Sequence, residues 1–269
     1  MAKVVTGVRR VVAVASGKGG VGKTTVTVNL ALALALDGAR VGIFDADIYG
    51  PNVPLMLGVR RTQPPRGMLP VARADAVPYI PPLHRYGLQM MSIGLLLPET
   101  ATVMPDPRFA GMIVTRTLQD VLWDNLDYLL IDLPPGTGEP QQSLVQQVRV
   151  DGAVVVTTPQ DLSLLDAGRS LGLFRQAGVP VLGVVENMSH LHCPHCGEEI
   201  TVFHHTDRSW AIEDKALPVL GKIPMDGLIS RGIDAGHPLV QTAPDAAEAS
   251  VFRGIARAVV ARLEEQAHG

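Results

Sequence analysis

Hydrophobic positions along the chain form two alternating patterns. Short apolar runs rich in β-branched residues, each followed by Gly, Pro or Asp, are typical of buried strands, and they occur at residues 11–15, 41–44, 128–131, 153–157 and 181–185. Segments with helical periodicity lie between them, at residues 24–36, 112–123 and 164–176. This alternation predicts an α/β fold, a mainly parallel twisted sheet with helices on both faces, and ligands at the carboxyl ends of the strands.

The last predicted helix, at about residues 246–265, is apolar on one side and charged elsewhere. Its apolar stripe indicates packing against the body of the protein. The Pro- and Gly-rich stretch at residues 64–82 is more typical of a surface loop than of a linker between domains. We therefore expect residues 1–269 to form a single domain.

Composition narrows the possible functions. The chain has 269 residues, a net charge of −3 and no run of five like charges, so we expect no general nucleic-acid binding. No stretch approaches the roughly 18 apolar residues of a membrane span, so we expect no membrane insertion. Two cysteines are too few for a disulfide framework and favour metal or redox chemistry in a reducing compartment, which predicts a cytoplasmic protein.

A glycine-rich loop follows the first predicted strand and precedes the first predicted helix. It matches the phosphate-binding pattern G-x-x-x-x-G-K-[ST], in which backbone N–H groups surround phosphates, Lys23 neutralises them and the Thr24 hydroxyl helps to hold Mg²⁺. A glycine-rich turn that binds nothing would not require the Lys-Thr pair. The predicted nucleotide-binding residues of the loop are Gly17, Lys18, Gly19, Gly20, Val21, Gly22, Lys23, Thr24 and Thr25.

Two aspartates end predicted strands where a nucleotide-hydrolysing protein needs carboxylates. Asp132 is the candidate carboxylate on the Mg²⁺ side, and Asp47 is the candidate for positioning the attacking water. Either aspartate alone would be interpreted as a helix cap or turn residue. Together with the phosphate loop they favour a functional interpretation.

Lys18 is an additional lysine inside the loop. It resembles the signature lysine of the deviant Walker A group, which includes MinD-like, ParA-like, nitrogenase-iron-protein-like and Mrp-like ATPases. In that group the lysine reaches the nucleotide of a partner subunit, so the resemblance implies a homodimer and a catalytic role for Lys18 beside Lys23, Asp47 and Asp132. The alternative is a solvated loop lysine.

Cys193 and Cys196 form a CxxC pair in a loop at about residues 190–200. Two thiolates are half of a tetrahedral ligand set, and the chain has no other cysteine, so a four-thiolate site requires two chains. The spacing alone favours zinc, completed by His190, His192 or His195. A thioredoxin-like redox pair and an inert turn are further alternatives.

From about residue 11 to 263 the chain resembles the Mrp family of ATP-dependent iron–sulfur cluster carriers. The cysteine loop distinguishes the Mrp family from MinD-like and ParA-like relatives, because those relatives lack it. The chain differs from the family in two segments. The family usually has Trp-Arg-Gly-Pro-Met where this chain has residues 105–113, and a glycine run where it has residues 204–208. The matching motifs lie at residues 17–24, 45–52, 91–94, 131–138, 157–160, 186–189 and 193–197.

The resemblance implies a slow ATPase coupled to cluster transfer. Cys193 and Cys196 would bind a [4Fe–4S] cluster bridged across a homodimer, and Asn187 would read the adenine of ATP. Partners would be cluster-assembly donors and apoprotein recipients. Two alternatives stay open: a MinD/ParA-like positioning switch, and an ATP-dependent dimer with a structural zinc on the cysteine pair.

Overall fold

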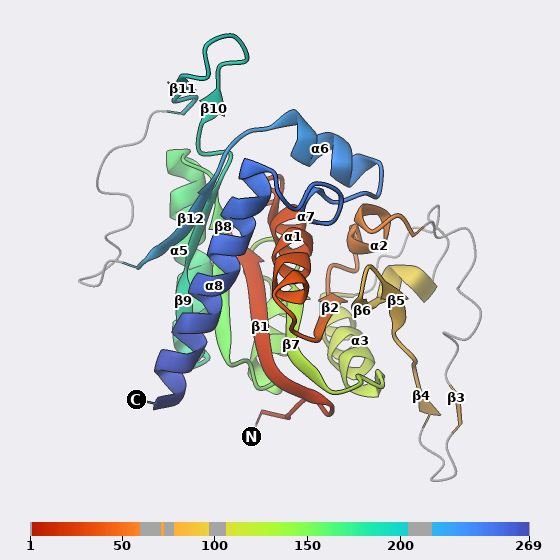
Figure 1. Ribbon diagram of the computed structural model, residues 1–269. Helices are drawn as coiled ribbons and strands as arrows, with labels where there is room; N and C mark the ends of the chain where they lie inside the picture. The colour runs from red at the N-terminus through yellow and green to blue at the C-terminus, as the bar shows by residue number, and fades with distance from the viewer. Residues whose placement is uncertain (1, 60–70, 73–77, 97–105, 204–216, 269) are drawn as a thin grey trace.

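The fold is built on one central sheet of eight strands (Figure 1). The computed structural model describes residues 2–59, 71–72, 78–96, 106–203 and 217–268. Strand order is β12-β9-β8-β1-β7-β2-β6-β5, and every neighbouring pair is parallel except β5 and β6. The strands are β1 (Val8–Ser16), β2 (Val41–Asp45), β5 (Leu83–Arg85), β6 (Leu88–Ser92), β7 (Leu126–Asp132), β8 (Gly152–Thr157), β9 (Val181–Asn187) and β12 (Val219–Ile223).

Helices cover both faces of the sheet. Figure 1 shows α1 (Lys23–Leu36) and α8 (Ala247–His268) in front of it, and α3 (Pro107–Asp120) and α5 (Asp161–Gln176) behind it. This three-layer arrangement confirms the predicted α/β fold class. The shorter elements are η1 (Ile93–Leu96), α2 (Val53–Met56), α4 (Glu139–Gln147), α6 (Gly227–Asp234), α7 (Leu239–Thr242), β3 (Val71–Ala72), β4 (Pro78–Tyr79), β10 (Leu191–His192) and β11 (Glu199–Ile200).

The central strands are buried on both faces, which explains their continuous apolar sequences. All six residues of β8 are buried, as are the last six of β1. The five predicted strands are confirmed. The helix expected at residues 112–123 begins earlier, at Pro107, and ends at Asp120, because Val121 instead forms a bridge with Ile80.

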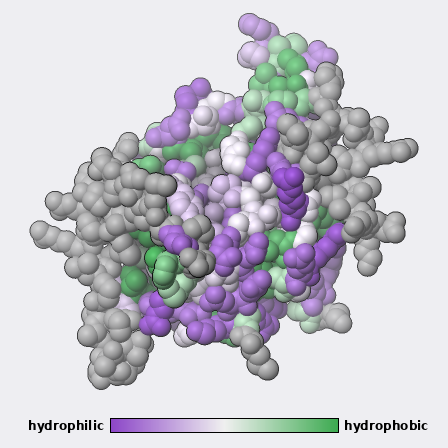
Figure 2. Space-filling model, turned by 180° about the vertical axis from the view of Figure 1, so that it is seen from behind, coloured by the Kyte–Doolittle hydropathy of each residue, from purple (hydrophilic) through white to green (hydrophobic). Residues whose placement is uncertain are grey.

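A short hairpin of β10 and β11 projects from the carboxyl end of β9 (Figure 1). Seen from behind, hydrophobic residues gather on this projection (Figure 2). Leu191, Ile200 and Val202 are exposed there. Among the described residues no helix is long and apolar enough to cross a membrane.

The apolar stripe of α8 should contribute strongly to stability. Phe252 is fully buried in this helix, which packs on α1 and β12. We expect Phe252→Ala to lower the free energy of unfolding by about 3–5 kcal/mol, because the truncation leaves a cavity. Urea denaturation followed by circular dichroism measures the change, with Gln266→Ala on the exposed side of α8 as the control. A loss no larger than in the control would contradict this prediction.

Candidate functional site

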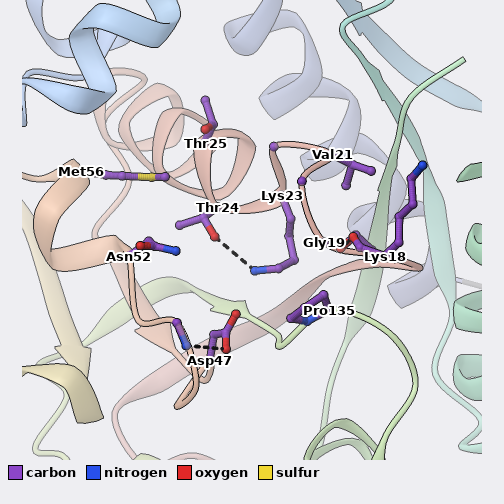
Figure 3. Close-up of a pocket in the computed structure, with 14 residues that line it drawn as sticks. Lys18, Gly19, Val21, Lys23, Thr24, Thr25, Asp47, Asn52, Met56 and Pro135 are labelled. Atoms are coloured by element: carbon purple, nitrogen blue, oxygen red, sulfur yellow. Dashed lines mark hydrogen bonds between the residues drawn. The ribbon is translucent and has the colours of Figure 1, made fainter. Parts of the chain in front are cut away.

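The glycine-rich loop wraps a cavity of about 300 Å³ at the carboxyl end of β1 (Figure 3). Gly20 and Gly22 have φ angles of 82° and 80°, a left-handed conformation that other residues adopt only at a cost. Helix α1 starts directly after Gly22, and no side chain caps its first turn. This first turn lines the cavity, so the backbone N–H groups that the helix itself does not bond are available to an anion.

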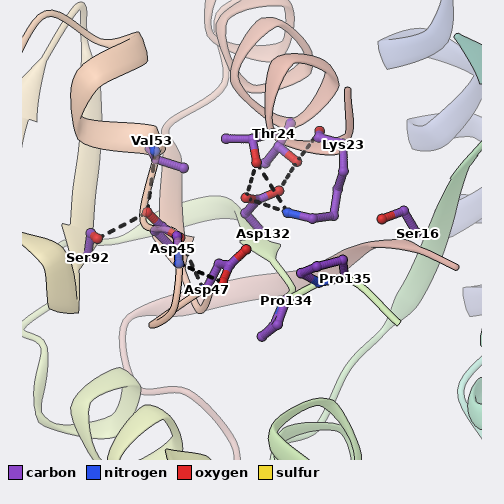
Figure 4. Close-up of polar contacts among 12 residues, drawn as sticks. Ser16, Lys23, Thr24, Asp45, Asp47, Val53, Ser92, Asp132, Pro134 and Pro135 are labelled. Atoms are coloured by element: carbon purple, nitrogen blue, oxygen red, sulfur yellow. Dashed lines mark hydrogen bonds and ion pairs between the residues drawn. The ribbon is translucent and has the colours of Figure 1, made fainter. Parts of the chain in front are cut away.

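Lys23 and Asp132 form a buried ion pair beneath this loop (Figure 4). The distance from Lys23 Nζ to Asp132 Oδ2 is 2.7 Å, and the two side chains are only 6% and 1% exposed. Thr24 Oγ1 and Thr27 Oγ1 each donate a hydrogen bond of 2.7 Å to the Asp132 carboxylate. The structure thus brings together the predicted Lys23, Thr24 and Asp132, and it adds Thr27, which no sequence motif indicated.

The oxygens of Thr24 and Asp132 are adjacent and hard, and such oxygens suit Mg²⁺. Mg²⁺ also keeps several waters and substrate phosphate oxygens in its shell, and the cavity next to these residues leaves room for them. The donor set therefore fits the predicted ion.

Asp47 lines the same cavity, and its Oδ1 accepts a hydrogen bond of 3.1 Å from the Gly50 backbone N–H (Figure 3). Burial raises the pKa of Asp47, although the charge of Lys23 opposes this increase. A carboxylate with a raised pKa is a better proton acceptor than an ordinary one.

Asp45 lies two residues earlier and has a different role. Its carboxylate is 1% exposed and accepts hydrogen bonds from Ser92 Oγ at 3.0 Å, from the Val53 backbone N–H at 3.3 Å and from the Asp47 backbone N–H at 3.1 Å (Figure 4). Burial raises the pKa of Asp45 to about 8, and the nearby Asp132 carboxylate adds to the increase. Asp45 thus holds the ends of β2 and β6 and the start of α2 together around the segment that carries Asp47.

A second cavity of about 390 Å³ adjoins the first and shares Gly22, Thr25 and Met56 with it. Asn187, at the end of β9, lines this cavity and donates a hydrogen bond of 2.8 Å to the carbonyl of Val21. A Cβ atom on Gly22 would lie 2.2 Å from Asn187 Nδ2, so the asparagine packs directly on the loop. The remaining lining residues are Met188, Pro224, Met225, Asp226, Ile229, Ser230, Ile233 and Asp234, a largely apolar wall that suits a nucleobase.

Lys18 does not point into its own cavity. Figure 3 shows its side chain directed away from Lys23 and Thr24. Its ammonium donates to Gln160 Oε1 at 3.2 Å on the exposed side of the loop. A Cβ atom on the preceding Gly17 would lie 2.1 Å from the Asp166 backbone, so the loop is seated tightly on α5 while this lysine faces outward.

The cysteine pair occupies the turn between β10 and β11. The Cys193 backbone N–H donates to the Glu198 carbonyl at 2.8 Å, and the Gly197 N–H donates to the Cys193 carbonyl at 2.9 Å. Both thiols are free. Hydrogen bonds to Cys193 from the backbone N–H groups of Cys196 and His195 lower its pKa, which favours the thiolate that binds metals.

A zinc site completed by a histidine of the same chain is not formed by the described residues. Within them, no group of three or more His, Cys, Asp or Glu side chains is placed to hold a metal ion. The divergent segment at residues 204–208 lies outside the described residues, as does residue 105.

Comparison with known proteins agrees with this geometry. The family model described as ParA: NUBPL iron-transfer P-loop NTPase matches residues 7–260. The iron-sulfur cluster carrier protein of Haemophilus influenzae is 45% identical over 260 residues, covering 96% of this chain and 68% of that protein. The corresponding protein of Methanocaldococcus jannaschii is 41% identical, covering 96% and 86%.

Solved structures show the same fold. A nucleotide-binding protein from Archaeoglobus fulgidus in complex with ADP, with cobalt found in it, has a TM-score of 0.71 and 34% identity, covering 86% of this chain and 88% of that one. The septum site-determining protein MinD from Pyrococcus horikoshii, in complex with Mg-ADP, has a TM-score of 0.65 and 26% identity, covering 93% and 95%. The chain therefore has the P-loop nucleotide-binding fold predicted for it.

The raised pKa of Asp45 predicts a pH dependence of stability. An unfolded aspartate has a pKa of about 3.9, so between about pH 4 and 8 the folded protein binds more protons than the unfolded chain, and the free energy of unfolding decreases as pH rises. We expect Asp45→Asn to show a smaller decrease between about pH 5 and 8, measured by urea denaturation of the nucleotide-free protein. Identical pH slopes in the two proteins would show that Asp45 is ionised throughout.

Proposed function

Because the chain belongs to the family of NUBPL-type iron-transfer P-loop NTPases, we propose that it is an ATP-dependent carrier of iron–sulfur clusters, with the cluster as its cargo. One observation carries this proposal: the only cysteine pair of the chain starts six residues beyond Asn187, which is bonded to the phosphate loop. Cargo site and nucleotide site are thereby joined through the end of a single strand, β9.

ATP would lie across the two adjoining cavities. Its phosphates would occupy the glycine-rich loop, where the N–H groups at the start of α1 and the Lys23 ammonium offset their charge. The base would lie beside Asn187, whose amide can both donate to and accept from a purine edge. Thr24 and Asp132 would hold Mg²⁺, which neutralises phosphate charge when bound.

Asp47 is the group that would orient the attacking water. It lines the phosphate cavity, is held by Gly50, and has a raised pKa. Among the described residues no arginine lines this cavity. Since such an arginine supplies a large part of the rate in fast enzymes of this kind, we expect slow hydrolysis.

A homodimer would complete both sites. Lys18 extends outward from the loop, as expected of a residue that reaches the nucleotide of a second copy. Two thiolates per chain supply half of the ligands of a [4Fe–4S] cluster, so two hairpins must meet to hold one. The exposed Leu191, Ile200 and Val202 on the hairpin are apolar side chains that such a meeting would bury.

The strand β9 offers a physical route by which nucleotide could affect the cluster. Binding at the loop would shift Val21 or Asn187, and the next residues lead into the hairpin through a hydrogen bond of 2.9 Å from the Ser189 backbone N–H to the Ile223 carbonyl. Cysteines on two such hairpins need to separate only slightly to loosen a bridged cluster. Apoproteins would receive the cluster in that state, and cluster-assembly proteins would supply it.

Anaerobic reconstitution with iron and sulfide tests the carrier function. We expect brown protein with about four irons per dimer, and loss of both colour and iron in Cys193→Ala and Cys196→Ala. His195→Ala, which alters the same turn without removing a thiol, is the matched control. Activation of the apo form of a [4Fe–4S] enzyme measures transfer. Colourless protein with stoichiometric zinc would overturn the carrier function and leave a dimer clasped by zinc.

Lys18→Ala tests the role of the outward lysine. We expect this variant to bind ATP in each chain through Lys23 but to lose ATP-dependent dimerisation and most ATPase activity, because the charge offered to the partner's phosphates is gone. Light scattering with and without ATP measures dimerisation, and a fluorescent ATP analogue measures binding.

Lys3, which is exposed and whose ammonium bonds to the side chain of Gln119, provides the control substitution to alanine. Normal ATP-dependent dimerisation of the Lys18→Ala protein would show that this lysine is merely solvated.

A further inference from the structure

Two histidines stand side by side at the base of the cysteine hairpin. His190 and His192 are two residues apart in an extended segment, so their side chains lie on the same face. Their Nε2 atoms are 3.3 Å apart, and their ring planes meet at 82° with centroids separated by 4.8 Å. The nucleotide and cysteine sites use neither imidazole.

Ser189 gives the Nδ1 atom of His190 a hydrogen-bond partner. Ser189 Oγ donates its one hydrogen to the Ile223 carbonyl at 3.1 Å and lies 2.7 Å from His190 Nδ1. While the hydroxyl hydrogen is directed to Ile223, the hydroxyl oxygen is free to accept from Nδ1–H. In that tautomer neutral His190 keeps a lone pair on Nε2, which lies beside His192.

This arrangement is the one that metal-binding histidines use. A ligating imidazole almost always donates its other N–H to an oxygen that fixes the ring, and Ser189 serves that purpose here. Nitrogens about 2.0–2.1 Å from a tetrahedral Zn²⁺ lie roughly 3.3–3.4 Å from each other. The observed separation of 3.3 Å matches this value and is at the long end for a direct hydrogen bond.

We propose that His190 and His192 form a two-imidazole site for a borderline divalent cation such as Zn²⁺ or Fe²⁺, separate from the thiolate pair. Within the described residues no third His, Cys, Asp or Glu joins the pair in a metal-binding group, so water fills the remaining positions. His190 is half-buried and His192 is exposed, which leaves the site open to solvent on one side.

A cation there would brace the hairpin. Strand β10 has only two residues, and the body of the protein holds its base through hydrogen bonds from the Ser189 N–H to the Ile223 carbonyl and from the Met225 N–H to the His190 carbonyl, at 2.9 and 2.7 Å. An ion joining His190 to His192 ties the second residue of β10 to this anchored segment. The site does not depend on the cluster function proposed above.

Zinc binding to the full chain with both cysteines replaced, Cys193→Ser/Cys196→Ser, tests the site without competition from thiolates. With Mg-ADP saturating the nucleotide site, we expect isothermal titration to give about one Zn²⁺ per chain. His192→Ala in this background should weaken binding at least about tenfold, and Ser189→Ala should weaken it about tenfold by releasing the His190 ring. His195→Ala, in the same loop, should leave the affinity unchanged.

A second readout is independent of affinity. Imidazole ¹⁵N spectra of the zinc-free protein should show His190 protonated on Nδ1 and bare on Nε2, with the Nε2 resonance shifting when Zn²⁺ is added. Equal zinc affinity with and without His192, or a His190 proton on Nε2, would overturn the proposal. Cluster loading is measured separately in a His192→Ala protein that keeps both cysteines. Failure of the two-histidine site is thereby distinguished from failure of the carrier function.

Discussion

The buried ion pair between Lys23 and Asp132 is the interaction on which the nucleotide site depends. Removing both charges from water is costly, and one partner without the other would be strongly destabilising. The cost is offset because Thr24 and Thr27 also donate to the carboxylate. The pair therefore holds the phosphate loop, the start of α1 and the end of β7 in one geometry before any nucleotide arrives.

The same ion pair makes the charges of the site sensitive to a bound phosphate. A phosphate entering the loop competes with Asp132 for the Lys23 ammonium, so binding must redistribute charge among neighbouring carboxylates. Asp45 and Asp47 lie next to this charge, and the pKa values of both are raised by burial. Because Asp45 also ties β2, β6 and α2 together, a change in its protonation or contacts would reach the segment that carries Asp47.

On the opposite side of the loop, Asn187 gives the nucleotide site a mechanical connection to the cysteine hairpin. Its amide is buried against Val21 and Gly22, so it cannot move independently of the loop. The hairpin leaves the apolar side chains of Leu191 and Ile200 exposed, and Cys196 is exposed at its turn. The buried nucleotide site thus adjoins the projecting hairpin through the end of β9.

The sequence by itself determined the elements whose signals are local. Strand runs at 11–15 and 128–131 are continuous apolar stretches because both faces of the sheet are buried. The phosphate loop is a contiguous motif, and its Gly20 and Gly22 adopt a positive φ that glycine tolerates best. Short or less typical strands were missed. For example, β6, Leu88–Ser92, contains two methionines and a glutamine and no β-branched residue, and it becomes a strand by pairing with β2 and β5.

Only the tertiary structure decided which distant residues meet. Thr27 joins Asp132 across 105 positions of the chain because α1 packs on β7. Ser92 joins Asp45 across 47 positions because parallel strands bring their carboxyl ends to one edge of the sheet. Sequence reasoning grouped His190 and His192 with the cysteines as possible zinc ligands. It could not foresee that Ser189, held by Ile223 of β12, orients His190 toward His192, because hydrogen-bond geometry depends on neighbours that only folding supplies.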